Sequence, residues 1–203
     1  KSLDQNTCAQ VYVTPFEWTK AYPIPARKDA HLALDLLHHQ YGVFHTIIPD
    51  NAKELTKGGF PEKARKAGSL IFPVEAYTPN QNRAESSIRE LKRMYRRAMI
   101  ASTAPRALWD HCFELQAEIR SHTALDLLAL QGDVPETVLL GDTTDISNLC
   151  QFSWYELVWH IDPRDSLEKK KLGRWLGPSH NIGDAMSYKI LVKSGLIVIQ
   201  TSV

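Results

Sequence analysis

Two acidic side chains have the residue types and the surroundings that could hold a metal ion. Asp50 follows a short apolar run at residues 43–48, and Glu85 lies near the start of a helical pattern that follows a loop rich in proline and asparagine. An apolar run of this length is typical of a buried strand, so we expect Asp50 at the carboxyl end of that strand. A carboxylate from a strand and one from a helix offer the oxygen ligands that Mg²⁺ takes, with water and phosphate at its remaining positions. The first hypothesis is metal-assisted phosphoryl transfer.

The helix predicted after this loop carries basic side chains on the same side as Glu85. Its apolar stripe, with a spacing typical of one long helix against a core, consists of Ala84, Ile88, Leu91, Tyr95 and Ala98. Arg89, Lys92 and Arg96 follow Glu85 at spacings of four, seven and eleven, which places them on its face. Two interpretations stay open: these residues bind phosphates along the helix, or the face is solvated and a Glu85–Arg89 pair adds roughly 0.2–0.5 kcal/mol.

The segments around these residues, ALDLLHHQYGVFHTIIPDNAKE and YTPNQNRAESSIRELKRMYRRAM, resemble the catalytic core of retroviral-type integrases. They are most similar to the Ty1/copia class of LTR retrotransposons. The resemblance implies an RNase H-like fold in which Asp, Asp and Glu hold two divalent ions, Mg²⁺ or Mn²⁺, for DNA strand transfer. Asp50 matches the second Asp and Glu85 matches the Glu. The resemblance also implies that Arg89 and Lys92 contact the DNA end.

The loop before the helix offers further polar contacts but departs from the family pattern. Gln81 and Asn82 could contact the strand end of DNA or could cap the helix. Arg83 follows where family members usually have Gly, and Ala52 also stands at a family Gly position. If the backbone at Ala52 needed a positive φ, Ala would strain it.

The resemblance places the first catalytic Asp in a strand upstream of the hairpin that begins near Thr7. We therefore expect residues 1–203 to lack that Asp and the sheet to be incomplete at its first strand. Asp4 is the nearest candidate, but it aligns with the turn after the strand. Two-metal chemistry depends on both ions clamping the attacking and leaving oxygens. Without the bridging carboxylate we expect this chain to be inactive in strand transfer.

The remaining pattern predicts an α/β core followed by a small β region. The expected core elements are strands at 7–14, 18–25, 43–49 and 69–74, a helix at 28–41 capped by Asp29, a helix ending at Gly68, and a helix at 105–122 capped by Thr103. From about residue 151 the chain changes to short apolar strands separated by glycine and polar turns. We assign residues 1–145 to the RNase H-like core and 146–203 to a C-terminal β domain. Trp175 and the lysines at 169–171 could touch nucleic acid, although a core tryptophan and a charged linker are the simpler interpretation.

The bulk composition limits the protein classes and the cellular settings that fit this sequence. The 203 residues carry a formal net charge of +1, with 43% hydrophobic and 23% charged residues, which is typical of an ordinary globular protein. A basic DNA contact must therefore be local. The three cysteines show no C-x-x-C pairing, which favours a reducing intracellular setting. No apolar run approaches the length of a membrane span.

The first hypothesis is a retrotransposon integrase, a Mg²⁺-dependent polynucleotidyl transferase that acts on DNA ends and target DNA, inactive as given. The resemblance implies a homo-oligomer in the full-length protein and a nuclear location. Two alternatives remain open: a non-catalytic nucleic-acid-binding or interaction remnant, and an RNase H-like nuclease.

Overall fold

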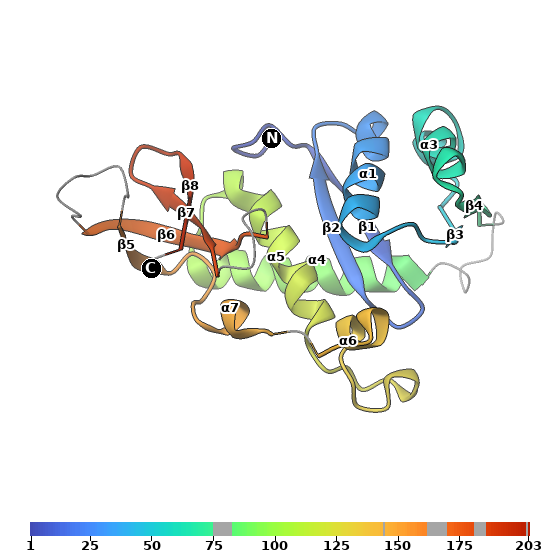
Figure 1. Cartoon of the computed structure of the whole chain (residues 1–203). Helices are drawn as coiled ribbons and strands as arrows, with labels where there is room; N and C mark the ends of the chain where they lie inside the picture. Colours follow the sequence, from blue (N-terminus) through green and yellow to red (C-terminus); the bar gives the residue numbers. More distant parts are fainter. Residues whose placement is uncertain (75–82, 144, 162–169, 181–185, 202) are drawn as a thin grey trace.

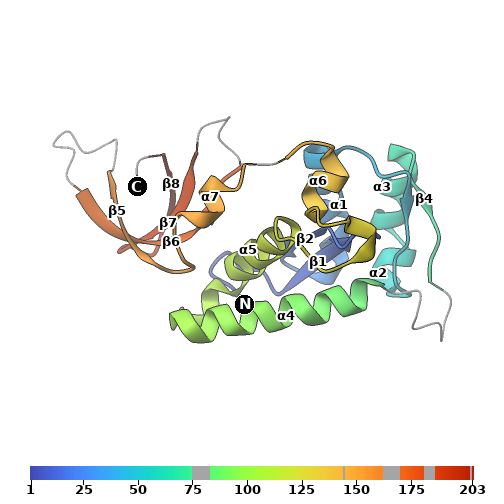
Figure 2. The same cartoon turned by 90° about the horizontal axis from the view of Figure 1, so that it is seen from below.

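The structure, a computed structural model, describes residues 1–74, 83–143, 145–161, 170–180, 186–201 and 203. Two lobes lie on either side of the central helix α5 (Figures 1 and 2). The strands are β1 (Cys8–Val13), β2 (Thr19–Ile24), β3 (Thr46–Ile47), β4 (Leu70–Ile71), β5 (Leu157–Ile161), β6 (Lys170–Pro178), β7 (Tyr188–Val192) and β8 (Ile197–Gln200). The helices are η1 (Arg27–Asp29), α1 (Ala30–Tyr41), α2 (Lys53–Thr56), α3 (Gly59–Ala67), α4 (Arg83–Ser102), η3 (Arg106–Leu108), α5 (Trp109–Ser121), η4 (Leu128–Leu130), α6 (Pro135–Leu140) and α7 (Ser147–Cys150).

The N-terminal hairpin confirms the first two predicted strands. β1 and β2 pair antiparallel, in a register that runs from Cys8 opposite Ile24 to Val13 opposite Thr19. Pro23 lies within β2, and β1 is the only strand that pairs with β2 in the described part of the chain. Because proline cannot donate a ladder hydrogen bond, it fits the edge strand that its position predicts.

Two predicted helix caps are wrong in detail. Asp29 occupies the N-cap position of α1, but its side chain makes no capping hydrogen bond. Thr103 is not a cap, because its backbone has a φ of +55° and the short helix η3 precedes α5. The prediction at Gly68 is right: it ends α3 with a φ of +95°, a conformation that glycine adopts without a Cβ penalty.

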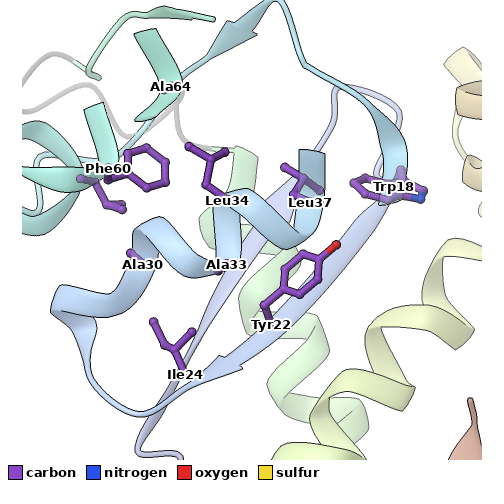
Figure 3. Close-up of a cluster of buried hydrophobic side chains, with 10 residues drawn as sticks. Trp18, Tyr22, Ile24, Ala30, Ala33, Leu34, Leu37, Phe60 and Ala64 are labelled. Carbon is purple, nitrogen blue, oxygen red and sulfur yellow. The ribbon is translucent and has the colours of Figure 1, made fainter. Parts of the chain in front are cut away.

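A cluster of buried apolar side chains holds α1 between β2 and α3 (Figure 3). Ala33, Leu34 and Leu37 point from α1 into this cluster, where Phe60 meets them from α3 and Trp18 from the start of β2. Burying a leucine of this kind contributes about 1.5–3 kcal/mol relative to leaving it exposed. This packing fixes α1 on one face of the hairpin.

The described strands of the N-terminal lobe form two separate pairs. β3 pairs in parallel with β4, and β1 pairs with β2, but no described strand joins the two pairs. The prediction of a buried strand at 43–49 is wrong in extent and burial, since β3 has two residues and Ile48 is 63% exposed. Among the described strands, none pairs with the edge of β3 opposite β4.

The two long helices cover the other face of the hairpin. α4 runs beneath β1, and α5 packs against both β2 and β6 (Figure 2). Polar side chains of α5 are buried as well as apolar ones, namely Asp110, Gln116, Glu118 and Ser121. Helix α5 is therefore enclosed on several sides, and it connects the two lobes.

The C-terminal lobe contains an antiparallel sheet in the order β5-β6-β7-β8. Trp175 in β6 is 1% exposed and packs with Tyr188 and Ile190, which confirms its interpretation as a core tryptophan. A Cβ on Gly173 would lie 2.3 Å from Cγ2 of Ile190, so β6 and β7 need glycine there. The boundary between residues 145 and 146 stays a prediction. No described helix combines the length and the apolar character needed to cross a membrane.

Candidate nucleic-acid interface

Asp50 lies on an exposed loop directly after β3. Its Oδ1 accepts a hydrogen bond from the backbone N–H of Ala52 at 3.0 Å, which prepares the start of α2. The carbonyl of the preceding Pro49 accepts from Val74 N–H at 3.0 Å. Ala52 has a φ of −60°, so the strain that a positive φ would cause does not arise. The strand end holds Asp50 in place with one carboxylate oxygen engaged.

Glu85 lies in the first turn of α4, where its side chain is exposed. Its Oε1 is 3.6 Å from Nη2 of Arg89, one turn further along the helix. Both side chains are more than half exposed, so this pair contributes about 0.3–0.5 kcal/mol to the helix. Glu85 and Arg89 therefore remain available to a ligand.

The exposed side of α4 is more basic than the predicted residues alone. We define the α4 basic face as the exposed side chains Arg89, Lys92, Arg93, Arg96 and Arg97. Arg93 and Arg97 are the residues that the sequence interpretation omitted, although each stands four residues after another basic residue of the set. Arg93 contacts Glu90 at 3.3 Å. A face of five cations over nine residues concentrates positive charge in a chain whose net charge is +1.

The inner side of α4 is held by a polar contact that the apolar stripe did not predict. Ser87 is 1% exposed and donates to Oε2 of Glu17 at 2.5 Å. The same oxygen accepts from Nη2 of Arg120 at 2.8 Å. This contact joins α4 to the hairpin and to α5, and it turns the α4 basic face outward.

A groove of about 770 Å³ separates the two parts of the N-terminal sheet. We call it the sheet groove; its rims are residues 8–14 on one side and 46–50 on the other. Lys92 and Arg96 line it together with Asp50, whereas Glu85 and Arg89 are not among its lining residues. Ala84 and Ile88, on either side of Glu85, do line it.

The predicted site residues are therefore brought together in part. Asp50, Lys92 and Arg96 share the sheet groove, while Glu85 and Arg89 lie on the exposed part of the same helix. Gln81 and Asn82 lie outside the described residues. Glu54 also lines the groove; in the sequence it fits an exposed turn residue at least as well as a site residue.

The carboxylates of the described residues do not assemble the three-ligand set of the resemblance. Asp50 and Glu85 have the donor type that Mg²⁺ prefers, but one oxygen of Asp50 holds Ala52 and Glu85 faces Arg89. Among the described residues, the group of three or more ligand-type side chains lies elsewhere, at Asp4, Asp110 and His111. As described, the site does not fit a two-metal centre.

That second group is a structural contact between the N-terminal turn and α5. His111 Nε2 lies 3.0 Å from Oδ2 of Asp4, and Asp110 accepts from the Asn6 amide at 2.9 Å. The Asp4 candidate thus lies beside α5, and it is not a lining residue of the sheet groove.

Comparison with known proteins places the fold. No protein-family model and no curated protein sequence matches the chain. A crystal structure of the BIV integrase catalytic core domain has a TM-score of 0.50 at 16% identity, over 66% of this chain and 91% of that one. The simian T-cell lymphotropic virus intasome, solved in complex with the PP2A regulatory subunit B56 gamma, has a TM-score of 0.56 at 14% identity, over 96% of this chain and 72% of that one. The fold of this chain is that of an integrase catalytic core, with small antiparallel strands added at the C-terminus.

Proposed function

We propose that this chain is an integrase-type DNA-binding core, derived from a polynucleotidyl transferase of the Ty1/copia class, that lacks strand-transfer activity in residues 1–203. The α4 basic face carries this proposal. It starts one turn after Glu85 and presents five exposed cations beside the groove that contains Asp50. The similarity of fold to integrase cores and the matched segments around Asp50 and Glu85 support the assignment.

The α4 basic face suits the phosphate backbone of DNA better than a protein partner. Its cations recur every three or four residues along one helix, and a row of this kind can follow successive phosphates. Each neutralised phosphate releases counterions, so five contacts would give a slope of about −4 to −5 in log affinity against log salt. Lys92 and Arg96 would bind on the groove side, and Arg89, Arg93 and Arg97 on the outer side.

A divalent ion, Mg²⁺ or Mn²⁺, belongs to the proposal as a weakly held ligand. Asp50 and Glu85 would hold it through carboxylate oxygens, and in a complete site it would supply charge stabilisation for phosphoryl transfer. Among the described residues, no third carboxylate joins Asp50 and Glu85 in a ligand cluster, so we expect residues 1–203 to bind DNA without strand transfer. The proposed partners are DNA ends and target DNA, with a homo-oligomer and a nuclear location for the full-length protein.

Charge reversal on α4 tests DNA binding. Arg89→Glu with Lys92→Glu should weaken binding of a fluorescent DNA duplex by at least about tenfold at low salt and lower the salt slope by about 2. The matched control reverses Arg65 and Lys66 on α3, which are also exposed. Equal losses in the two double variants would contradict a specific role for α4.

Catalysis is tested separately. We expect no joined product from a strand-transfer assay of residues 1–203 with Mg²⁺ or Mn²⁺, and DNA binding should survive Glu85→Gln. Strand transfer that disappears in Glu85→Gln would contradict the proposed inactivity and would restore the enzyme interpretation. The proposal thus combines integrase ancestry with a non-catalytic, DNA-binding role; hydrolysis of DNA without joining would instead favour an RNase H-like nuclease.

A further inference from the structure

The turn before β1 and the first turn of α5 bring three side chains with metal-ligating atoms together. Asp110 and His111 come from α5, and Asp4 comes from the turn. One ligand atom from each of the three lies within 4.8 Å of the other two. Neither Asp50 nor Glu85 belongs to this group, so it is a second place in the molecule where an ion could bind.

Asp110 is a buried carboxylate whose hydrogen-bond partners are neutral. It is 1% exposed, and its oxygens accept from the Asn6 amide at 2.9 Å and from the backbone N–H of His111 at 3.1 Å. Among the described residues, no lysine or arginine forms a salt bridge with it. Buried carboxylates are as a rule paired with a cation or bound to a metal. Asp110 therefore has the surroundings expected of a metal ligand.

The imidazole of His111 gives an independent sign of a bound ion. Both ring nitrogens are enclosed and make no hydrogen bond within the described part of the chain, and the side chain is 11% exposed. Nε2 lies 3.0 Å from Oδ2 of Asp4, out of line for a hydrogen bond. Bonds from zinc to nitrogen and oxygen of about 2.0–2.2 Å place two ligands of one ion about 2.9–3.4 Å apart. The His111–Asp4 pair has this spacing, and an ion would give the buried nitrogen the partner it otherwise lacks.

Hydrogen bonds from other residues hold the turn against the start of α5. Leu3 N–H donates to the carbonyl of Ala107 at 2.7 Å, and two bonds of 2.9 Å join Ser2 to Asn6. Asp4 is thus carried on a fixed loop, and its side chain, which is 52% exposed, can rotate to shorten the distance to the other two ligands. Its exposed side leaves room for water as a further ligand.

The donor set selects the kind of ion. Imidazole nitrogen favours zinc and related transition metals, whereas Mg²⁺ and Ca²⁺ take oxygen ligands. Two carboxylates neutralise the charge of a divalent ion. Three protein ligands leave one position of a tetrahedral zinc ion for water. Zinc therefore fits this group better than Mg²⁺ does.

We propose that Asp4, Asp110 and His111 bind one Zn²⁺ ion, which fixes the N-terminal turn to the start of α5. One ligand comes from the turn and two come from the helix, so the three meet only in the folded chain, and binding stabilises that state. The proposal depends neither on DNA binding nor on an ion at Asp50 and Glu85.

The test is a calorimetric titration of residues 1–203 with Zn²⁺, in excess Mg²⁺ so that sites made of carboxylates alone are filled. One equivalent should bind. Asp4→Asn, which keeps the shape of a half-exposed side chain, and His111→Gln should each raise the dissociation constant by at least about tenfold. His39→Ala, on the exposed side of α1, is the matched control and should leave it unchanged. Equal affinities in Asp4→Asn, His111→Gln and the original chain would overturn the proposal, as would the absence of a one-equivalent site.

Two further measurements locate the ion. Zn²⁺ should shift the imidazole NMR signals of His111 more than those of the other histidines. It should also slow the amide hydrogen exchange of Leu3 and Asn6 by at least about tenfold in the original chain, and should have little effect on these amides in Asp4→Asn. Slowing of equal size in Asp4→Asn, or a larger shift at another histidine, would show that the ion binds elsewhere and would overturn the proposal.

Discussion

The two lobes differ in whether their strands pair with the neighbouring strand in the sequence. In the C-terminal lobe each strand from β5 to β8 pairs with the next strand along the chain. In the N-terminal lobe β1–β2 is a local hairpin, whereas β3–β4 forms a separate pair with two residues in each strand. Pairing between neighbours in sequence costs little loop-closure entropy, while non-local pairing needs every intervening strand in place. The groove therefore results from the order in which the strands pair, and not from a low strand propensity of the residues beside it.

Packing follows the same division. The C-terminal sheet buries Trp175, Leu176 and Ile190 almost completely. Near β3 and β4, Val43, Ile48 and Phe72 are more than half exposed. An apolar surface of this kind usually marks a binding site or an interface. Stability should therefore be greater in the C-terminal lobe than near β3.

Truncation of Trp175 should produce the largest effect. Trp175→Ala removes the largest side chain of the C-terminal cluster and should cost about 3–5 kcal/mol, read as a lowered urea midpoint. The matched control is Trp159→Ala in β5, which is 56% exposed and should change stability by about 0.5 kcal/mol or less. Similar losses in the two variants would contradict the buried position of Trp175.

Truncation of a buried leucine in α1 tests how tightly the N-terminal lobe is packed. Leu34→Ala should cost about 2–3 kcal/mol, the lower part of the range for buried leucine, because neighbouring residues border the groove and can relax into it. Leu36→Ala, on the exposed side of the same helix, is the control and should cost little. A loss from Leu34→Ala as large as that from Trp175→Ala would show that the two lobes are equally well packed.

Local features of this fold were predictable because each depends on residues close in sequence. The spacing from Ala84 to Ala98 gave α4, and Gly68 marked the end of α3. The alternation at residues 7–14 gave β1. Turn chemistry and helical periodicity act within one or two turns, so they are visible in a single sequence.

Contacts between distant segments could not be predicted. Glu118 reads as a surface residue of a helix, yet it is buried and meets His180, 62 residues away, at 2.5 Å. Ser87 and Glu17, 70 residues apart, are joined in the same way. Ile48 is exposed because it lines the sheet groove, and the groove cannot be predicted from the residues around Ile48 alone. The position of Asp50 was predictable as a strand end, but its place in a groove that Glu85 does not line was not.

The contact between Glu118 and His180 should make the joint between the lobes sensitive to acid. Burial raises the pKa of Glu118, but the hydrogen bond from His180 and the charge of Lys20, with a smaller effect of His122, hold it below its ordinary value of 4.5. Because the folded-state pKa is lowered, this stabilisation is complete above pH 4.5 and is lost as the pH falls below that value.

Glu118→Gln should therefore cost about 1–3 kcal/mol at pH 7, since Lys20 and His180 lose a buried charged partner. The variant should also lose less stability than the original chain between pH 4.5 and acid, measured by urea unfolding at each pH. Glu114→Gln, one turn earlier on α5, is the control and should leave the acid limb nearly unchanged. Parallel pH profiles for Glu118→Gln and the original chain would contradict the lowered pKa.

The smallest effect should come from the second contact between the lobes, Lys189 with Glu114 at 2.9 Å. Both side chains are less than one-third exposed, so a double-mutant cycle with Glu114→Ala and Lys189→Met should give a coupling of about 0.5–1 kcal/mol. The Glu85–Arg89 pair on α4 is longer and more exposed, and its coupling should be smaller and should vanish at high salt. The Lys189–Glu114 coupling depends on both side chains staying half-buried in the contact between β7 and α5. A coupling smaller than that of the exposed α4 pair would show that this contact does not persist in solution.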